Sequence, residues 1–502
     1  MDFVNTLNGY LWGTVFLILV IGLAIFYTVA LKFPQVRLFK EMMGSLSKGR
    51  ASESGLTPFQ SFAMALGGRI GTGTIAGVAT AIALGGPGAV FWMWIYALLG
   101  VPLAIVESSL AQLWKERIEG EYKGGPSYYL RKTPLPWLGA YVAYAGIIGY
   151  GFTGPVVQSF TITDSFVNAF HIPAIVTGII LAVLFGVIVI GGMRRIGSIA
   201  GYVVPIMAIA YLAVTIVVLL VNITRIPSMF ALIFKSAFHM EAMYAGIFGA
   251  AINWGIRRAV YSSEAGMGTG ANAAASAETS HPVKQGLAQG FSVYNTLIVC
   301  TCTALIILCT GMYNVYDASY APIVENLPGV DVGAGYVQAA INTITGSTNI
   351  GSIFVAIATF FFAFTTLLSF GFYAAVGLAM VFKKTKYLKQ IILGVTMLQM
   401  VSIILGGVWK SDLAWAIADV GVGSAAWINL LGLLCLIKPM LKLMKDYDRQ
   451  RDKGLDPVYD PANNDIGGDE LWTEIVDKHY KERNEANNVA TNTNKKELGL
   501  KL

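Results

Sequence analysis

The stretch "GGRIGTGTIAG" (residues 67–77) interrupts a long apolar segment with five glycines and one arginine, Arg69. Glycine costs about 1 kcal/mol per position relative to alanine in the interior of a helix. An unbroken helix would be the less costly solution in such apolar surroundings. The glycines therefore indicate that the chain breaks a helix here, and the break must serve either binding or packing.

The composition is typical of a membrane protein. Of the 502 residues, 55% are hydrophobic and 13% are charged, whereas a soluble domain carries about 25% charged residues. Apolar segments of about 20 residues or more recur along the chain, without the alternating strands of about ten residues that mark a barrel. We therefore predict an all-α integral membrane protein. Its eleven transmembrane helices are expected near residues 11–31, 57–84, 88–114, 136–168, 173–193, 198–222, 243–272, 286–313, 350–382, 387–409 and 412–438.

Charge divides the chain into a transmembrane domain, residues 1–440, and a polar tail, residues 441–502. The N-terminus begins "MDFVN" without a basic region, so the first apolar segment is expected to be a span rather than a signal peptide. Lys and Arg gather in loops on one side, which is then cytoplasmic. With eleven spans, the N-terminus lies outside a plasma membrane and the C-terminus inside. The net charge of +6 reflects these loops, and no nucleic-acid partner is expected.

The tail contains one amphipathic stretch, "DELWTEIVDKHYKERNE" (residues 469–485). Its apolar helical face either lies on the membrane surface or docks on the cytoplasmic loops. The remainder is rich in Asn and Lys and is expected to be disordered.

The spans after the first form two sets of five, about residues 57–222 and 243–438. Each set opens with a glycine-interrupted segment, and the mate of "GGRIGTGTIAG" is "SSEAGMGTGANAA" (residues 262–274). Because five is odd, the second set crosses the membrane in the opposite direction, which makes the two sets an inverted repeat. Paired broken helices in an inverted repeat predict a substrate site near the middle of the membrane.

A helix that breaks within the membrane frees N–H and carbonyl groups, and each costs several kcal/mol if it stays unpaired in hydrocarbon. The N–H groups suit a carboxylate, and the carbonyls suit a small cation or an ammonium group. An amino acid together with a cation satisfies both sets. The alternative is that the glycines only allow helices to pack closely, but two such stretches at matching positions favour a site.

Other polar residues in the spans have both a binding and a packing interpretation. The Gln158 amide can donate and accept, so it can contact a carboxylate or an ammonium group or form a hydrogen bond between helices. Thr365 and Thr366 are adjacent, with hydroxyls about 100° apart around their helix. They suit a Na⁺ site, or they bond back to their own helix.

Buried charges flank both glycine-rich stretches. Charged groups within a membrane are usually paired, so Arg69 is expected to pair with Glu107 or Glu264. A fixed ion pair is favoured over a proton-carrying role. Arg257 and Arg258 precede the second break, and the sequence assigns them no partner.

The stretch "GGPGAVFWMWIYALLG" (residues 85–100) resembles the alanine/glycine:cation symporter family, the sodium:alanine symporters. Both glycine-rich stretches are similar to that family too, and the resemblance covers about residues 10–440. It implies a LeuT-type five-plus-five inverted repeat with one extra N-terminal helix. It also implies Na⁺-coupled uptake of alanine or glycine, with H⁺ used by some relatives.

The resemblance implies roles for single residues. The N–H groups of Thr72 and Gly73 would hold the substrate carboxylate. The carbonyls of Gly67 and Ile70 would face Na⁺. The other expected ligands are the hydroxyls of Thr365 and Thr366 for Na⁺, and Gln158, Ser263, Glu264, Gly266, Met267, Thr366 and Phe370 for the substrate, with Phe370 covering its side chain. Arg69 departs from the LeuT-type pattern, which has a small residue there.

We therefore expect a monomeric symporter in a lipid membrane that imports a small neutral amino acid by alternating access. Na⁺ is the coupling ion and no cofactor is expected. The alternatives are proton coupling through Glu264 or Glu107 and a larger neutral substrate such as glutamine. The asymmetric repeat disfavours a channel, the spans hold no His, Asp or Cys cluster for an enzyme, and no P-loop is present for ATP.

Overall fold

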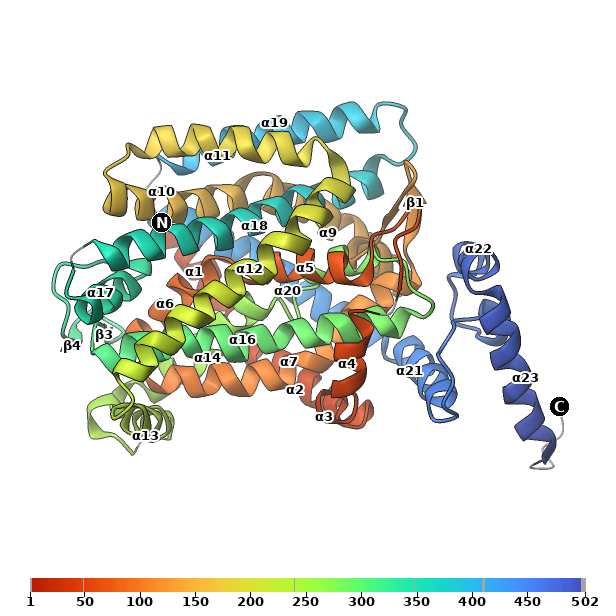
Figure 1. The fold of residues 1–502 in the computed structure, drawn as a ribbon, viewed down its shortest axis with the longest axis horizontal. Coiled ribbons are helices and arrows are strands. Elements are labelled where there is room, and N and C mark those ends of the chain that lie inside the picture. The colour runs from red at the N-terminus through yellow and green to blue at the C-terminus, as the bar shows by residue number, and fades with distance from the viewer. Residues whose placement is uncertain (1, 48, 239, 348, 409–410, 498–502) are drawn as a thin grey trace.

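A computed structural model describes residues 2–47, 49–238, 240–347, 349–408 and 411–497. Helices make up most of these residues, which confirms the all-α class. The longest helices run roughly along the long axis of the molecule, except that the helix at residues 192–221 crosses the others obliquely (Figure 1). They are α7 (Gly88–Leu113), α12 (Gly192–Val221), α16 (Pro282–Thr310) and α18 (Ile350–Phe382).

Shorter helices complete the bundle. Those of ten residues or more are α1 (Asp2–Leu11), α2 (Thr14–Ala30), α5 (Pro58–Arg69), α6 (Ala76–Gly85), α9 (Trp137–Ile148), α10 (Gly154–Phe170), α11 (Ala174–Val189), α13 (Ile226–Ala237), α14 (Phe248–Ser263), α17 (Ala334–Thr345), α19 (Leu388–Gly406) and α20 (Ser411–Cys435). The shortest are α3 (Pro34–Arg37), α4 (Phe39–Ser45), η1 (Thr72–Thr74), α8 (Pro126–Tyr129), η2 (Leu130–Lys132), η3 (Gly149–Thr153), η4 (Ala242–Ile247) and α15 (Thr269–Ala275).

Seven helices of the described chain are long and apolar enough to cross a membrane, or eight if the bent pair of α20 and the helix after it counts as one span. A helix also occupies each of the other predicted segments. Two of these, 57–84 and 243–272, are broken, and α11 has only 16 residues. Eleven spans therefore remain a prediction. Residue 409, the end of the tenth predicted span, lies outside the described residues.

Two small hairpins were not predicted. β1 (Glu116–Ile118) pairs antiparallel with β2 (Glu121–Lys123), and β3 (Asn314–Tyr316) pairs antiparallel with β4 (Pro322–Glu325). Figure 1 shows β3 and β4 beside α17 at one end of the bundle, and β1 at the opposite end near the tail helices. Both lie in loops, where strands of three or four residues give too short a pattern to detect.

The tail folds against the bundle. It contains α21 (Ile437–Arg451), η5 (Pro461–Asn463), α22 (Asp469–His479) and α23 (Lys481–Glu497). The buried Trp472 indole donates to the carbonyls of Gln112 and Leu113 at the end of α7, over 3.2 Å each. Of the two placements expected for α22, docking is the one observed. Disorder was the wrong expectation for α23, and residues 498–502 lie outside the described part.

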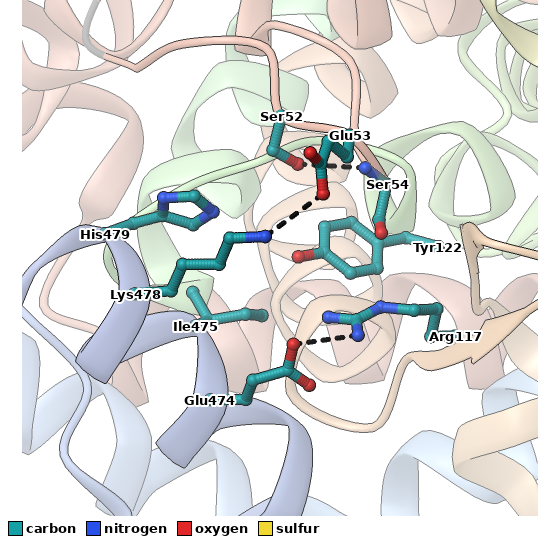
Figure 2. A pocket seen from close by; sticks show the side chains of 9 residues that line it. All are labelled: Ser52, Glu53, Ser54, Arg117, Tyr122, Glu474, Ile475, Lys478 and His479. Carbon is teal, nitrogen blue, oxygen red and sulfur yellow. Dashed lines mark hydrogen bonds and ion pairs between the residues drawn. The ribbon is translucent and has the colours of Figure 1, made fainter.

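Two ion pairs flank the docked α22 (Figure 2). Glu474 lies 2.8 Å from Arg117 in β1, and Lys478 lies 3.1 Å from Glu53. Both pairs are largely exposed, and such pairs contribute about 0–1 kcal/mol. Burial of the Trp472 side chain therefore holds α22 in place more strongly than these charges do.

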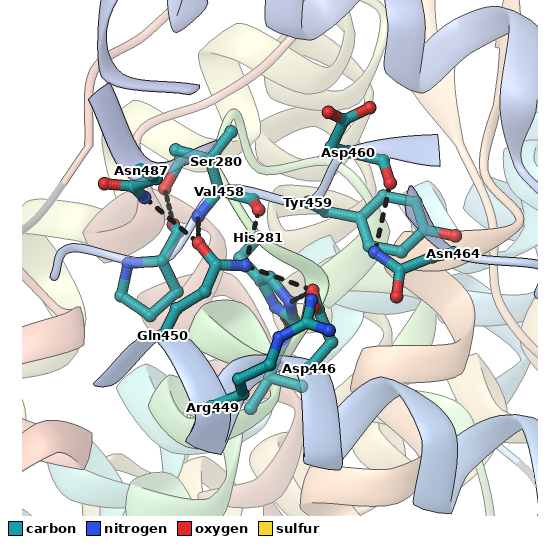
Figure 3. Close-up of polar contacts among 12 residues, drawn as sticks. Ser280, His281, Asp446, Arg449, Gln450, Val458, Tyr459, Asp460, Asn464 and Asn487 are labelled. Atoms are coloured by element: carbon teal, nitrogen blue, oxygen red, sulfur yellow. Dashed lines mark hydrogen bonds and ion pairs between the residues drawn. The ribbon is translucent and has the colours of Figure 1, made fainter. Parts of the chain in front are cut away.

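A second set of tail contacts surrounds the start of α16 (Figure 3). The buried His281 imidazole accepts from the Val283 N–H over 3.1 Å and lies 3.3 Å from the Asp446 carboxylate of α21. Tyr459 N–H donates to the Ser280 carbonyl over 2.8 Å. The tail is thereby joined to the loop that connects α15 with α16.

Candidate functional site

The first glycine-rich stretch breaks a helix, as predicted. A capping box starts α5, since Gln60 N–H donates to the Thr57 hydroxyl and Thr57 N–H to the Gln60 amide oxygen, over 3.1 Å each. The helix ends at Arg69. Gly71 then takes an extended conformation (φ −96°, ψ −154°) before η1 and α6 resume.

The second glycine-rich stretch breaks between α14 and α15. Glu264 there has φ +52°, which is uncommon for a residue with a side chain and costs of order 1–3 kcal/mol. Neighbouring helices satisfy the freed carbonyls. Tyr96 donates to the Ala265 carbonyl over 2.7 Å, and Asn429 to that of Gly266 over 3.0 Å. The break is therefore a stabilised feature of the fold.

At the first break, the expected carboxylate ligands lie beside Gln158 and Tyr261. The Thr72 N–H donates to the Gln158 amide oxygen over 3.4 Å, and both Thr72 and Gln158 are buried. A Cβ at Gly73 would lie 3.1 Å from the Tyr261 ring. Thus an acceptor oxygen already faces the N–H group that was expected to hold a carboxylate.

The hydroxyls of α18 meet the last turn of α5. Thr366 donates to the Gly67 carbonyl over 2.8 Å, and Thr365 lies 3.4 Å from the same oxygen. Both hydroxyls also bond back to Phe362, over 3.1 and 3.0 Å. The Gly67 carbonyl oxygen and the two hydroxyl oxygens therefore lie together at the end of α5. Within the described chain, these hydroxyls make no hydrogen bond with the fourth expected ligand, the Ile70 carbonyl.

A cavity of about 60 Å³ lies between α9, α15, α18 and α20, with room for a few water molecules. The expected substrate contacts Met267 and Phe370 line it. The Phe370 ring lies 5.4 Å from that of Tyr150, centroid to centroid. Ser263 is not among the residues that line the cavity, and its hydroxyl accepts from the Ala265 N–H within its own turn, over 3.3 Å.

The two breaks approach each other through Glu264. A Cβ at Gly68 would lie 3.5 Å from both Glu264 carboxylate oxygens and 3.0 Å from the Tyr373 hydroxyl. Glu264 Oε2 and the Tyr373 hydroxyl are both buried, and neither has a hydrogen-bond partner in the described chain. These polar groups can therefore take a ligand at the junction of the breaks.

The expected ion pair of Arg69 was wrong. No carboxylate of the described residues lies within 4 Å of its guanidinium, which donates instead to the Gln289 carbonyl over 3.1 Å and to the Gln289 amide oxygen over 3.2 Å. Glu107 accepts from Asn429 over 2.6 Å. The prediction considered only charged partners for Arg69. In the fold its partner is the uncharged Gln289, which accepts through two oxygen atoms.

Arg257 and Arg258, which had no assigned partner, share the buried Asp419 of α20. Arg257 pairs directly with its carboxylate, and Arg258 lies 3.8 Å from it. The Arg257 guanidinium also lies 4.8 Å from the Trp254 ring. The two arginines are therefore compensated where α14 meets α20.

Three tyrosines at the site were missed. Tyr150, Tyr261 and Tyr373 line the cavity together with Met267 and Phe370. Tyr261 directly precedes the second glycine-rich stretch, and Tyr373 follows Phe370 by three residues on one helix. Helical spacing from Phe370 would have indicated Tyr373, but nothing in the pattern distinguishes Tyr150 from a packing residue.

Comparison with known proteins supports the expected relationship. A family model described as "Sodium:alanine symporter family" matches residues 1–461. The chain belongs to this family. Its members are carriers, so the chain is a multi-pass membrane transporter and not an enzyme.

Similar proteins include a Bacillus subtilis protein named "Putative sodium/proton-dependent alanine carrier protein YrbD", 45% identical over 94% of this chain and 97% of its own. The "Sodium/proton-dependent alanine carrier protein" of Bacillus sp. (strain PS3) is 42% identical over 86% of this chain and 97% of its own. The "Probable sodium/glutamine symporter GlnT" of Bacillus subtilis is 39% identical over 93% of this chain and 95% of its own.

Proposed function

We propose that this chain imports alanine across the plasma membrane together with Na⁺, by alternating access. The observation that carries the proposal is the contact of the α18 hydroxyls with the last turn of α5 at the first break. Thr366 and Thr365 both face the Gly67 carbonyl, at 2.8 and 3.4 Å. Rotation of the hydroxyl hydrogens would turn these oxygens toward a cation.

The proposed fold is LeuT-type, with eleven spans, two inverted repeats (about 57–222 and 243–438), an external N-terminus and a cytoplasmic tail. The ends of the bundle support this orientation, because the Lys-free and Arg-free segment with β3 and β4 lies opposite the tail helices (Figure 1). The site would form within one chain, so we propose a monomer, with no cofactor beyond the coupling ion.

The substrate carboxylate would lie at the N–H groups of Thr72 and Gly73 and displace the Gln158 oxygen. Its ammonium group would lie toward Ser263, Glu264 and the carbonyls of the second break. The remaining proposed contacts are Gly266, Met267, Thr366 and Phe370 for the substrate and Gly67, Ile70, Thr365 and Thr366 for Na⁺.

The names of the similar proteins leave the substrate and the coupling ion to be tested. Two relatives are named for sodium/proton-dependent alanine transport and one for glutamine. Purified protein in proteoliposomes, given labelled alanine, glycine or glutamine under a Na⁺ gradient, is expected to accumulate alanine fastest. Faster glutamine uptake would replace the substrate assignment. Uptake driven by a pH gradient alone would show that H⁺, and not Na⁺, is the coupling ion.

A further inference from the structure

Arg69 is the charged residue of the first glycine-rich stretch, and the proposed binding site gives it no role. Its side chain is 2% exposed. One guanidinium nitrogen, Nη1, donates to both the backbone carbonyl and the side-chain amide oxygen of Gln289, over 3.1 and 3.2 Å. Arg69 therefore joins the last turn of α5 to the first third of α16.

The opposite edge of the guanidinium lies against α15. A Cβ built on Gly270, in the first turn of α15, would lie 2.5 Å from Arg69 Nη2 and 3.1 Å from its Cζ. Atoms this close overlap, so the guanidinium occupies the space that any other residue at this position would fill. The arginine of the first break thus contacts the glycine of the second.

Other polar contacts join the same three helices. The Ser61 hydroxyl of α5 donates to the Ala273 carbonyl of α15 over 2.7 Å and accepts from the Gln285 amide of α16 over 2.9 Å. Beyond Ser61, Leu56 N–H donates to the Ser276 carbonyl over 2.8 Å. Contacts thus extend from the start of α5 to its end at Arg69.

The positive charge of Arg69 also compensates buried negative charge. Glu264 and Glu107 interact with it electrostatically, and both carboxylates are buried. Charge inside a membrane protein is costly unless it is compensated. The guanidinium supplies compensation between two carboxylates while it binds neither of them directly.

We propose that Arg69 is a positioning residue that clamps the two broken helices together, so that α5, α15 and α16 move as one unit when the site opens to the other side. The inference rests on the proposed transport function. The chain then bends at residues 70–75 and 264–268, outside the clamped helices.

The clamp is tested at Gly270, which leaves the arginine itself unchanged. Gly270→Ala places a methyl group on the guanidinium and should separate Arg69 from Gln289. Gly77→Ala in α6 is the matched control, because its nearest atom would lie at an ordinary 3.7 Å. Alanine uptake by proteoliposomes should fall about tenfold for Gly270→Ala, as expected from one buried hydrogen bond of a charged group. It should stay within about twofold of wild type for Gly77→Ala.

The double variant Gly270→Ala with Arg69→Lys separates clamping from packing. Lysine keeps the charge, but its side chain ends one bond short of the Nη1 that donates to both Gln289 oxygens, and it leaves room for the methyl group. The overlap of the methyl group with the guanidinium should lower the melting temperature of Gly270→Ala. In the double variant the melting temperature should recover toward that of wild type, while uptake stays as low as in Gly270→Ala. If uptake recovers together with the melting temperature, Arg69 only fills space and the clamp is wrong.

Arg69→Lys alone provides a test if Gly270→Ala does not fold. It should retain alanine binding, measured by equilibrium binding of labelled alanine to the purified protein, and lose about tenfold in gradient-driven uptake. Wild-type uptake in Arg69→Lys would overturn the clamp. Absence of alanine uptake in the wild type itself would instead contradict the proposed function.

Discussion

The Thr366 hydroxyl donates to the Gly67 carbonyl over 2.8 Å and joins α18 to the last turn of α5 before the first break. We predict that Thr366→Val, which keeps the shape and removes the hydroxyl, raises the Na⁺ concentration for half-maximal alanine uptake about tenfold, because one cation ligand is lost. Thr359→Val on the same helix is the control, since the Thr359 hydroxyl has no partner in the described chain. Equal Na⁺ dependence of uptake in both variants would show that Thr366 is not a Na⁺ ligand.

Gly73 leaves no room for a side chain at the first break. A Cβ there would lie 3.1 Å from the Tyr261 ring and beside the N–H groups proposed for the carboxylate. We predict that Gly73→Val abolishes alanine binding, measured by equilibrium binding of labelled alanine, while circular dichroism remains helical. Retained binding at wild-type affinity would exclude the carboxylate role.

Trp472 holds the tail helix α22 on the bundle. Its indole is fully buried and donates to two carbonyls at the end of α7, and truncating a buried tryptophan costs about 3–5 kcal/mol. Trp472→Ala should release α22, so limited proteolysis should remove the tail faster than in wild type. Trp137→Ala, at a 60% exposed site, should leave the rate unchanged. Equal rates for both variants would show that other contacts hold the tail.

The contact of His281 with the tail should weaken in mild acid. Burial lowers the pKa of the His281 imidazole below its ordinary value of 6.5, and the nearby Asp446 carboxylate opposes this only in part. A released His281 binds a proton more readily than a docked one, so the docking free energy falls as the pH drops below about 6.5. Tail proteolysis should therefore accelerate from pH 7 to pH 5.

The matched variant for this pH dependence is His281→Asn. Asparagine retains a cap for α16 but does not titrate. Its proteolysis rate should be flat between pH 7 and pH 5. Asp446 does not contribute in this window, because its pKa lies below its ordinary value of 3.8. Burial raises this pKa, but His281, Arg449 and Asn464 together lower it by more. A pH dependence that persists in His281→Asn would contradict the assignment.

The sequence predicted the helical class, both breaks and the hydroxyls of α18, because each has a local cause. Glycine weakens a helix wherever it stands, and adjacent threonines project from a helix at a known angle. The partners of Arg69 had no local cause. Gln289 lies 220 residues away, and an uncharged acceptor gives no signal in a search for opposite charges.

The cavity and the tail show the same limit. Tyr150 of η3 and Met267, between α14 and α15, line one cavity although they lie far apart in the sequence, and no periodicity reports such a contact. The docking of α22 was one of two expectations that its amphipathic face allowed. The observed docking depends on the packing of Trp472 against the end of α7. Such a contact between distant segments cannot be read from the sequence.

The central claim is that two broken helices form a site for alanine and Na⁺. The most direct measurement is the uptake of labelled alanine into proteoliposomes that contain the wild-type chain, with an inward Na⁺ gradient or an equal K⁺ gradient. The account predicts accumulation above the external concentration with Na⁺ and none with K⁺. Equal uptake under both gradients, or none under either, would contradict it.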